Sequence, residues 1–402
     1  MNSTRCLVFL ILPLVALPIL AEAAWKRHTI DNTSQGADGV RLADINRDQR
    51  LDVVTGWEEG GLVRAYVQPT REWVRRPWPQ VTVGKVASPE DAVFVDLDHD
   101  GVWDVLSSCE GRTKSLFIHW SPRGSEPWRQ ATAWQTEAIP AAKGRESWMF
   151  ALPLPMQGAE HTPIVLGSKG SNASVSLLIP ASNTRNVADW TLVPIRSAGW
   201  IMSLRSFDFD RDGDLDILLS DRKGERSGVF WLENPGAEGL REPKSWKEHP
   251  IGAQGLEVMF LDLNEDAISR TISIVASVKP NRIFEFTRQP CSKHAWQGMP
   301  YDIEANTGTA KASHYADVDE DGNVDIIASS EHAVDGRIGV YWFSPRRSPN
   351  KTISQVHSIS GPQGIKFDRL ETIDLDGDGD LDVLTCEERD NLGVIWYENP
   401  TR

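Results

Sequence analysis

One acidic motif recurs along the chain at a nearly fixed spacing and constrains the fold more than any other feature. Its template is D-x-D-x-D-G-x-x-D, and copies begin at Asp44, Asp96, Asp208, Asp317 and Asp374. The first two copies start 52 residues apart, and the later spacing of about 55 residues leaves room for a damaged copy from Asp262 and a lost copy near Pro153. A fixed period of this size indicates repeated supersecondary units. The sequence therefore predicts seven repeats.

Each repeat contains the same series of short strands. An apolar strand follows the acidic loop, a second ends in an aromatic residue and a proline turn, as in Trp231 to Pro235, and a third begins with tryptophan, as at Trp246. A fourth leads into the next acidic loop. Four short strands repeated seven times predict an all-β fold, a seven-bladed β-propeller of four-stranded blades. The segment from Trp25 to Ile30 resembles a third strand without a repeat before it, so we expect it to complete the last blade and close the ring.

The acidic loops have the composition of calcium sites. Ca²⁺ takes six to eight oxygen ligands, and carboxylates at loop positions 1, 3, 5 and 9 can surround it. Glycine at position 6 permits the sharp turn. We predict about five structural Ca²⁺ sites, with Gln49 replacing the glycine in the first, and no metal in the copies at Asp262 and Pro153. The predicted ligands are Asp44, Asn46, Asp48, Asp52, Asp96, Asp98, Asp100, Asp104, Asp208, Asp210, Asp212, Asp216, Asp317, Asp319, Asp321, Asp325, Asp374, Asp376, Asp378 and Asp382.

These motifs resemble the FG-GAP or VCBS repeats, with the integrin α-subunit propeller as a distant relative. The match is closest where an acidic loop is followed by Trp-Leu-Glu-Asn-Pro at 231–235 or Trp-Tyr-Glu-Asn-Pro at 396–400. The resemblance implies calcium on one face of the ring and partners on the other. It also implies a role in adhesion or carbohydrate recognition and, less often, lyase or dehydratase activity.

The N-terminus and the overall charge limit the location and the partners. Arg5, an apolar run from Leu7 to Leu20 and Ala21-Glu22-Ala23 have the form of a signal peptide, so we expect residues 1–23 to be removed and 24–402 to form one propeller. The mature chain is then expected to be secreted or periplasmic, without a membrane span. A net charge of −15 disfavours nucleic acid as a partner. Cys109, Cys291 and Cys386 would remain, and the pattern leaves open whether two of them form a disulfide.

Strand alternation places a second set of loops on the face opposite the acidic loops. The loops after the first strand of each repeat and the links between blades should meet there, around the central channel. Their charged and aromatic side chains suit a polar ligand such as a glycan, or an extracellular protein. The predicted ligand-binding residues are Glu90, Asp91, Glu110, Arg145, Trp148, Lys169, Trp200, Asp221, Arg222, Lys223, Lys279, Glu331 and Glu387.

The sequence leaves more than one function open. The first interpretation is a secreted, calcium-stabilised binding module without catalysis. The alternative is a polysaccharide lyase or sugar dehydratase with its active site in the central cup, using an acid and a base from His314, His332, Glu110 and Lys279. A third interpretation is a purely structural envelope component. The oligomeric state is not indicated.

Overall fold

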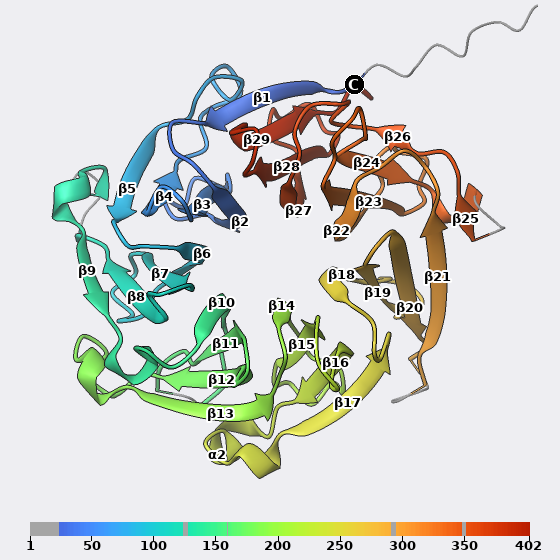
Figure 1. The fold of residues 1–402 in the computed structure, drawn as a ribbon. Coiled ribbons are helices and arrows are strands. Elements are labelled where there is room, and N and C mark those ends of the chain that lie inside the picture. Colours follow the sequence, from blue (N-terminus) through green and yellow to red (C-terminus); the bar gives the residue numbers. More distant parts are fainter. Residues whose placement is uncertain (1–23, 124–127, 159, 291–294, 348–350) are drawn as a thin grey trace, which may run out of the picture.

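The chain forms a ring of seven β-sheets, seen in a computed structural model that describes residues 24–123, 128–158, 160–290, 295–347 and 351–402 (Figure 1). The predicted signal peptide and Cys291 lie outside these residues. Each sheet is a blade whose first strand lies nearest the axis of the ring, and neighbouring strands within a blade are antiparallel. The predicted seven-bladed propeller is confirmed.

The blades follow one another in chain order. Blade 1 contains β2 (Ala37–Ala43), β3 (Asp52–Trp57), β4 (Leu62–Tyr66) and β5 (Gln80–Gly84). Blade 2 contains β6 (Pro89–Val95), β7 (Asp104–Cys109), β8 (Ser115–Trp120) and β9 (Gln135–Ala138). Blade 3 contains β10 (Ser147–Pro153), β11 (Ile164–Lys169), β12 (Ser174–Ile179) and β13 (Thr191–Ser197). Blade 4 contains β14 (Ile201–Phe207), β15 (Asp216–Asp221), β16 (Gly228–Glu233) and β17 (Lys247–Gly252).

The last three blades depart slightly from this pattern. Blade 5 contains β18 (Val258–Glu265), β19 (Ile272–Val278), β20 (Arg282–Arg288) and β21 (Gln297–Ile303), and it gains β25 (Thr352–Ile353) as a parallel fifth strand. Blade 6 contains β22 (Thr309–Ala316), β23 (Asp325–Glu331), β24 (Val340–Phe343) and β26 (His357–Ser358). Blade 7 contains β27 (Phe367–Ile373), β28 (Asp382–Glu387), β29 (Gly393–Glu398) and β1 (Lys26–Asp31). The helical segments are short: α2 (Gly236–Gly239), η1 (Ala131–Ala133), η2 (Pro140–Ala142), η3 (Val187–Asp189), η4 (Pro243–Ser245) and η5 (Pro345–Arg347).

The N-terminal strand closes the ring, as predicted. In Figure 1 the blue strand β1 lies along the red strand β29 at the outer edge of blade 7. Lys26 pairs with Glu398, and the antiparallel register continues to Asp31 and Val394. Because β1 and β29 come from opposite ends of the chain, this pairing covers an edge that would otherwise expose unpaired backbone groups.

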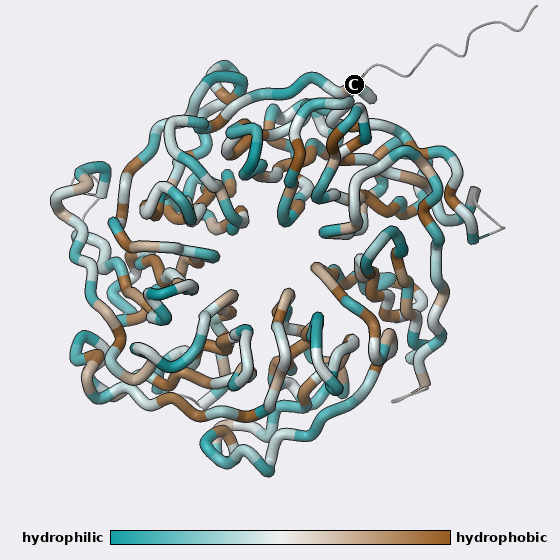
Figure 2. Tube along the Cα trace, in the orientation of Figure 1, coloured by the Kyte–Doolittle hydropathy of each residue, from teal (hydrophilic) through white to brown (hydrophobic). Residues whose placement is uncertain are grey.

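The core lies within and between the blades. Figure 2 shows hydrophobic segments along the strands and hydrophilic segments at the turns. The second strand of each blade is largely buried on both faces, because a neighbouring blade covers each side; all six residues of β15 are buried. Polar groups at these positions bond across blades, as where the Ser220 hydroxyl donates to the Met259 carbonyl at 2.7 Å. Cys109 and Cys386 are buried and free.

A stacked tryptophan and histidine recur at the outer edge of three blades. The ring of Trp231 on β16 lies 4.1 Å from that of His249 on β17, and Trp342 and His357 make the same contact at 4.0 Å. Trp396 stacks on His28 at 4.4 Å across the closing strand pair. These tryptophans are core residues. The contact between Trp396 and His28 joins strands from opposite ends of the chain, yet it has the same form as the contacts within blades 4 and 6.

Among the described residues, no helix is long and apolar enough to cross a membrane.

Candidate functional site

The acidic loops connect the first and second strands of their blades and share one conformation. The carboxylate at position 1 accepts a hydrogen bond from the backbone N–H at position 6, as between Asp208 and Gly213 at 3.1 Å. Gly213 has a φ of 98°, in the left-handed region that favours glycine. Gln49 holds the equivalent place with a φ of 69°, so the first loop keeps the same turn without the glycine. The residue at position 4 also has a positive φ, 66° at Arg211, a feature that the motif did not predict.

Carboxylate oxygens gather inside these loops. Ligand atoms of Asp208, Asp210 and Asp216 lie within 4.8 Å of one another, and the same holds for the groups Asp96, Asp98, Asp100 and Asp317, Asp319, Asp325. One oxygen of Asp96 and one of Asp317 are buried without a hydrogen-bond partner. Buried carboxylate oxygens usually have a donor or a cation beside them. These acidic clusters could therefore hold a metal ion.

The aspartate at position 9 also fixes the loop to its blade. Asp216 accepts hydrogen bonds from the backbone N–H groups of Phe209 and Asn234, both at 2.8 Å. The side-chain amide of Asn234 in turn donates to the Leu215 carbonyl at 2.9 Å. Burial raises the pKa of Asp216 to about 7 although both backbone bonds lower it. The Glu-Asn-Pro turn thus accompanies the acidic loop because its asparagine binds the last residue of that loop.

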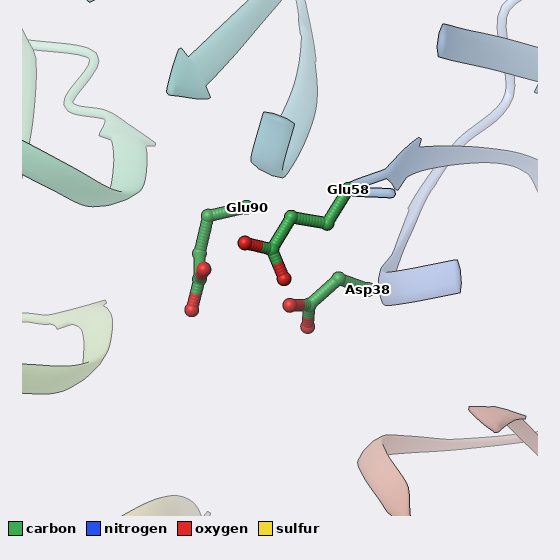
Figure 3. A group of neighbouring side chains, drawn as sticks. All are labelled: Asp38, Glu58 and Glu90. Carbon is green, nitrogen blue, oxygen red and sulfur yellow. The ribbon is translucent and has the colours of Figure 1, made fainter. Parts of the chain in front are cut away.

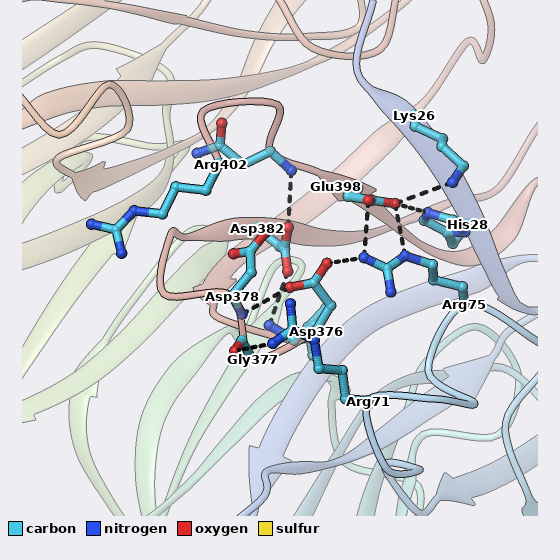
Figure 4. Close-up of polar contacts among 12 residues, drawn as sticks. Lys26, His28, Arg71, Arg75, Asp376, Gly377, Asp378, Asp382, Glu398 and Arg402 are labelled. Carbon is cyan, nitrogen blue, oxygen red and sulfur yellow. Dashed lines mark hydrogen bonds and ion pairs between the residues drawn. The ribbon is translucent and has the colours of Figure 1, made fainter.

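Arginine side chains contact predicted metal ligands in three of the loops. Arg50 pairs with Asp48 in the first loop, and Arg185 donates to Asp98 at 2.7 Å in the second. In the last loop Arg75 pairs with Asp376 (Figure 4). A guanidinium group and a cation compete for the same carboxylate oxygens, so these contacts lower the expected metal affinity.

The Asp262 copy of the motif is not a loop. Asp262 lies on β18 and pairs with Val275. Arg41 holds the equivalent position in blade 1, where it pairs with Val54. Because the acidic loop of blade 1 begins three residues after Arg41, the equivalent position in blade 5 is Glu265. The predicted alignment of this repeat was therefore wrong by three residues. Arg270 pairs with Glu265 at 3.2 Å across the turn.

The opposite end of the channel, here called the mouth, gathers carboxylates from blades 1, 2 and 7. In Figure 3 the side chains of Asp38, Glu58 and Glu90 point toward one another, and their ligand atoms lie within 4.8 Å of each other. A second group joins Asp38 to Asp368 and Glu388. Burial and the charges of Glu110 and Glu58 raise the pKa of Glu90 to about 8, although Lys169 lowers it. The mouth thus has an acidic half.

Aromatic and cationic groups form the other half of the mouth on blades 3 and 4. Trp200 lies beneath three cations: Lys169 at 4.6 Å, Arg222 at 4.4 Å and Lys223 at 5.0 Å from the ring centroid. Lys169 also pairs with Glu110, so it joins the basic half to the acidic half.

Ion pairs continue this arrangement around the ring. On blades 5 and 6 Lys279 pairs with Glu331, and Lys311 lies 3.8 Å from Glu331 and 3.5 Å from Asp368 of blade 7. Lys366 pairs with Glu388. Strand alternation correctly indicated that these loops meet, but Asp38 and Asp368 were missed as site residues. They could have been found, because Asp38, Glu90 and Asp368 are each the second residue of an innermost strand.

Several predicted ligand residues lie elsewhere. Trp148 is completely buried and donates to the Ala142 carbonyl at 3.1 Å. Asp91 and Asp221 are buried in ion pairs with Arg41 and Arg196. Glu387 is also fully buried and accepts hydrogen bonds from the backbone N–H groups of Asp390 and Leu392 in its own loop and of Ile365 in the link before β27. These four side chains stabilise the blades rather than face the mouth, and Arg145 is exposed on the link after blade 2.

Two of the four catalytic candidates, Lys279 and His332, share the carboxylate of Glu331, and the other two lie apart from them. Glu110 pairs with Lys169, and Lys279 pairs with Glu331 on a different side of the mouth. His332 lies 3.8 Å from Glu331, but its side chain is 70% exposed. His314 lies further along the channel, 2.9 Å from Asp262.

These features define a β-propeller with acidic loops at one end and a mouth of mixed charge at the other. Residues 317–385, which run from the acidic loop of blade 6 into β28 of blade 7, match the family model of the FG-GAP-like repeat. The chain is a seven-bladed β-propeller, and this match identifies an FG-GAP-like repeat within it. The comparison with curated proteins gives no match. A propeller of this kind suggests an interaction module.

Proposed function

We propose that this protein is an extracytoplasmic, calcium-stabilised binding module that takes a carbohydrate or protein ligand at the mouth. One observation carries the proposal: positively and negatively charged side chains from all blades meet at the mouth. Carboxylates come from blades 7, 1 and 2, and Lys169, Trp200 and Arg222 come from blades 3 and 4. Such groups donate to and accept from hydroxyl and charged substituents at the same time. The mutual pairing of the charges favours binding over proton transfer.

Calcium is the cation that the acidic loops suit best. Oxygen-only donor sets of clustered aspartates are typical ligands for this hard cation. The proposed ligands are the predicted loop residues, with the Asp208 and Asp317 loops uniting positions 1, 3 and 9. In the loops at Asp44, Asp96 and Asp374 the ion would compete with Arg50, Arg185 and Arg75. The proposed location outside the cytoplasm rests on the signal-like N-terminus.

A glycan-array experiment tests the ligand proposal. Wild-type protein, loaded with calcium, should bind a defined set of glycans, and Glu90→Gln and Lys223→Ala should each weaken that binding. The two side chains lie on opposite halves of the mouth. Glu90→Gln replaces a carboxyl group with an amide and Lys223→Ala removes an ammonium group, and neither variant breaks a buried ion pair.

Glu238→Gln is the matched control, because Glu238 is exposed on α2 at the outer rim. If the mouth variants bind the same glycans as strongly as the control, the ligand does not bind at the mouth. If no glycan binds to wild type, the carbohydrate part of the proposal fails.

A further inference from the structure

The middle of the channel carries a second group of charges, separate from the mouth. The fifth residues of the innermost strands β2, β14 and β27 are Arg41, Arg205 and Glu371. They lie three residues beyond the level of Asp38, which is about 10 Å along a strand. Arg369, two residues before Glu371, belongs to the same group. These residues line one cavity of about 260 Å³.

The carboxylates around this cavity leave guanidinium nitrogens available. Asp91 accepts from Nε and one terminal nitrogen of Arg41, both at 2.9 Å. Glu371 accepts from Nε of Arg369 at 2.9 Å, so this bond uses neither terminal nitrogen. Each bond orients a guanidinium group while part of its donor fork remains for another acceptor.

Arg205 supplies the clearest sign of a missing acceptor. It lies 3.1 Å from Asp262, yet its Nε is buried without a hydrogen-bond partner. A buried cationic donor without an acceptor is costly. Burial and the positive charges of Arg41 and Arg205 lower the pKa of Arg369 to about 10, although Glu371 raises it.

The opposite wall of the cavity is apolar. It consists of Leu42, Val93, Phe94, Ala151, Leu152 and Pro153, largely from blades 2 and 3. The fifth residues of the innermost strands are Val93 and Ala151 in blades 2 and 3, in place of Arg41 and Arg205 in blades 1 and 4. A ligand fitting both walls has an anionic end and a less polar body.

We propose that the channel binds an organic carboxylate, whose oxygens accept hydrogen bonds from Arg41, Arg205 and Arg369 while its body contacts the apolar wall. The carboxylate belongs either to a free organic acid or to an acidic sugar of a glycan entering from the mouth. Planar guanidinium groups match the geometry of a carboxylate and bind it with two parallel hydrogen bonds. This site goes beyond the function proposed above and does not depend on it.

Calorimetric titration at constant ionic strength tests the site. The probes are acetate, lactate and galacturonate, with galactose as the uncharged match for galacturonate and sodium sulfate as an inorganic anion. We expect at least one carboxylate to bind the wild type and galactose not to bind. Arg205→Gln should weaken carboxylate binding by about tenfold or more, since it removes charge-assisted hydrogen bonds.

Controls keep the result decisive. Arg241→Gln, at an exposed arginine that contacts Thr191, should bind like wild type. Arg205→Lys retains the charge opposite Asp262 and should bind more weakly than wild type, so it serves if Arg205→Gln does not fold.

Tighter binding of trigalacturonate than of galacturonate assigns the carboxylate to a glycan, and equal or weaker binding assigns it to a free acid. The proposal is overturned if no carboxylate binds, if sulfate alone binds, or if both Arg205 variants bind carboxylates like wild type.

Discussion

At the scale of single residues, the same side-chain type has different roles in different blades. Asp38 and Asp368 lie at the mouth, Asp216 fixes an acidic loop to its blade, and Asp221 is buried beside Arg196. The roles differ because the side chains differ in burial and in their bonding partners, and a local sequence motif specifies neither property. This is why the sequence identified the loop aspartates but assigned the buried Asp91, Asp221 and Glu387 to a ligand site.

His119 gives a residue-scale prediction about pH. Its ring is buried between the hydroxyls of Ser107 and Thr136, each at 2.9 Å, and burial lowers its pKa to about 3. The unfolded chain, with a histidine pKa of about 6.5, binds the additional proton between these values, so stability is lost as the pH falls below about 6.5. Between pH 7 and pH 5 the wild type should lose about 2 kcal/mol more unfolding free energy than His119→Gln, as measured by urea denaturation. Equal losses would show that His119 is not the buried neutral group described.

At the scale of elements, the connection between β4 and β5 links the first blade to the last. Arg71 donates to the Gly377 carbonyl at 2.9 Å, and Arg75 contacts Asp376 and Glu398 (Figure 4). Glu398 also binds His28, the partner of the Trp396 stack. Arg75 therefore joins the β4–β5 connection of blade 1 to the acidic loop and to β29 of blade 7.

Arg75→Ala should lower the unfolding free energy by about 1–3 kcal/mol, because it leaves the buried Asp376 without its ion-pair partner. It should also strengthen calcium binding by the last loop, since a competing cation is removed. Arg76→Ala is the matched control, because Arg76 is exposed and stacks on Trp73. Thermal unfolding with and without calcium measures both effects. If Arg75→Ala and Arg76→Ala unfold alike under both conditions, the link between blades has no energetic importance.

At the scale of the whole molecule, the repeat predicted blade number, strand order and closure because these follow from periodicity. It did not predict the group of arginines in the middle of the channel. Arg41, Arg205 and Arg369 lie on three separate blades and are brought together only by the ring. Nor did it predict the displaced repeat of blade 5, because Asp262 imitates the first residue of a motif while lying on a strand.

Closure yields a prediction for the complete ring. Deleting residues 24–31 removes β1 and exposes the edge of β29, so the variant should unfold at a lower temperature and self-associate. Arg27→Gln is the control, since the Arg27 side chain donates a hydrogen bond to the exposed Gln363 and β1 itself is retained. Thermal unfolding with light scattering measures both properties. A monomeric deletion variant with an unchanged melting temperature would contradict the proposed role of β1.

The central claim is that the acidic loops hold calcium and thereby stabilise the propeller. Thermal unfolding of metal-depleted protein in 5 mM calcium or in EDTA tests it most directly. A site with a dissociation constant of about 1 mM would add about 1 kcal/mol at this concentration, so several sites together should raise the melting temperature by several degrees. Asp208→Asn and Asp317→Asn should each reduce that rise, whereas Glu238→Gln should preserve it. The same melting temperature in calcium and in EDTA would contradict the account.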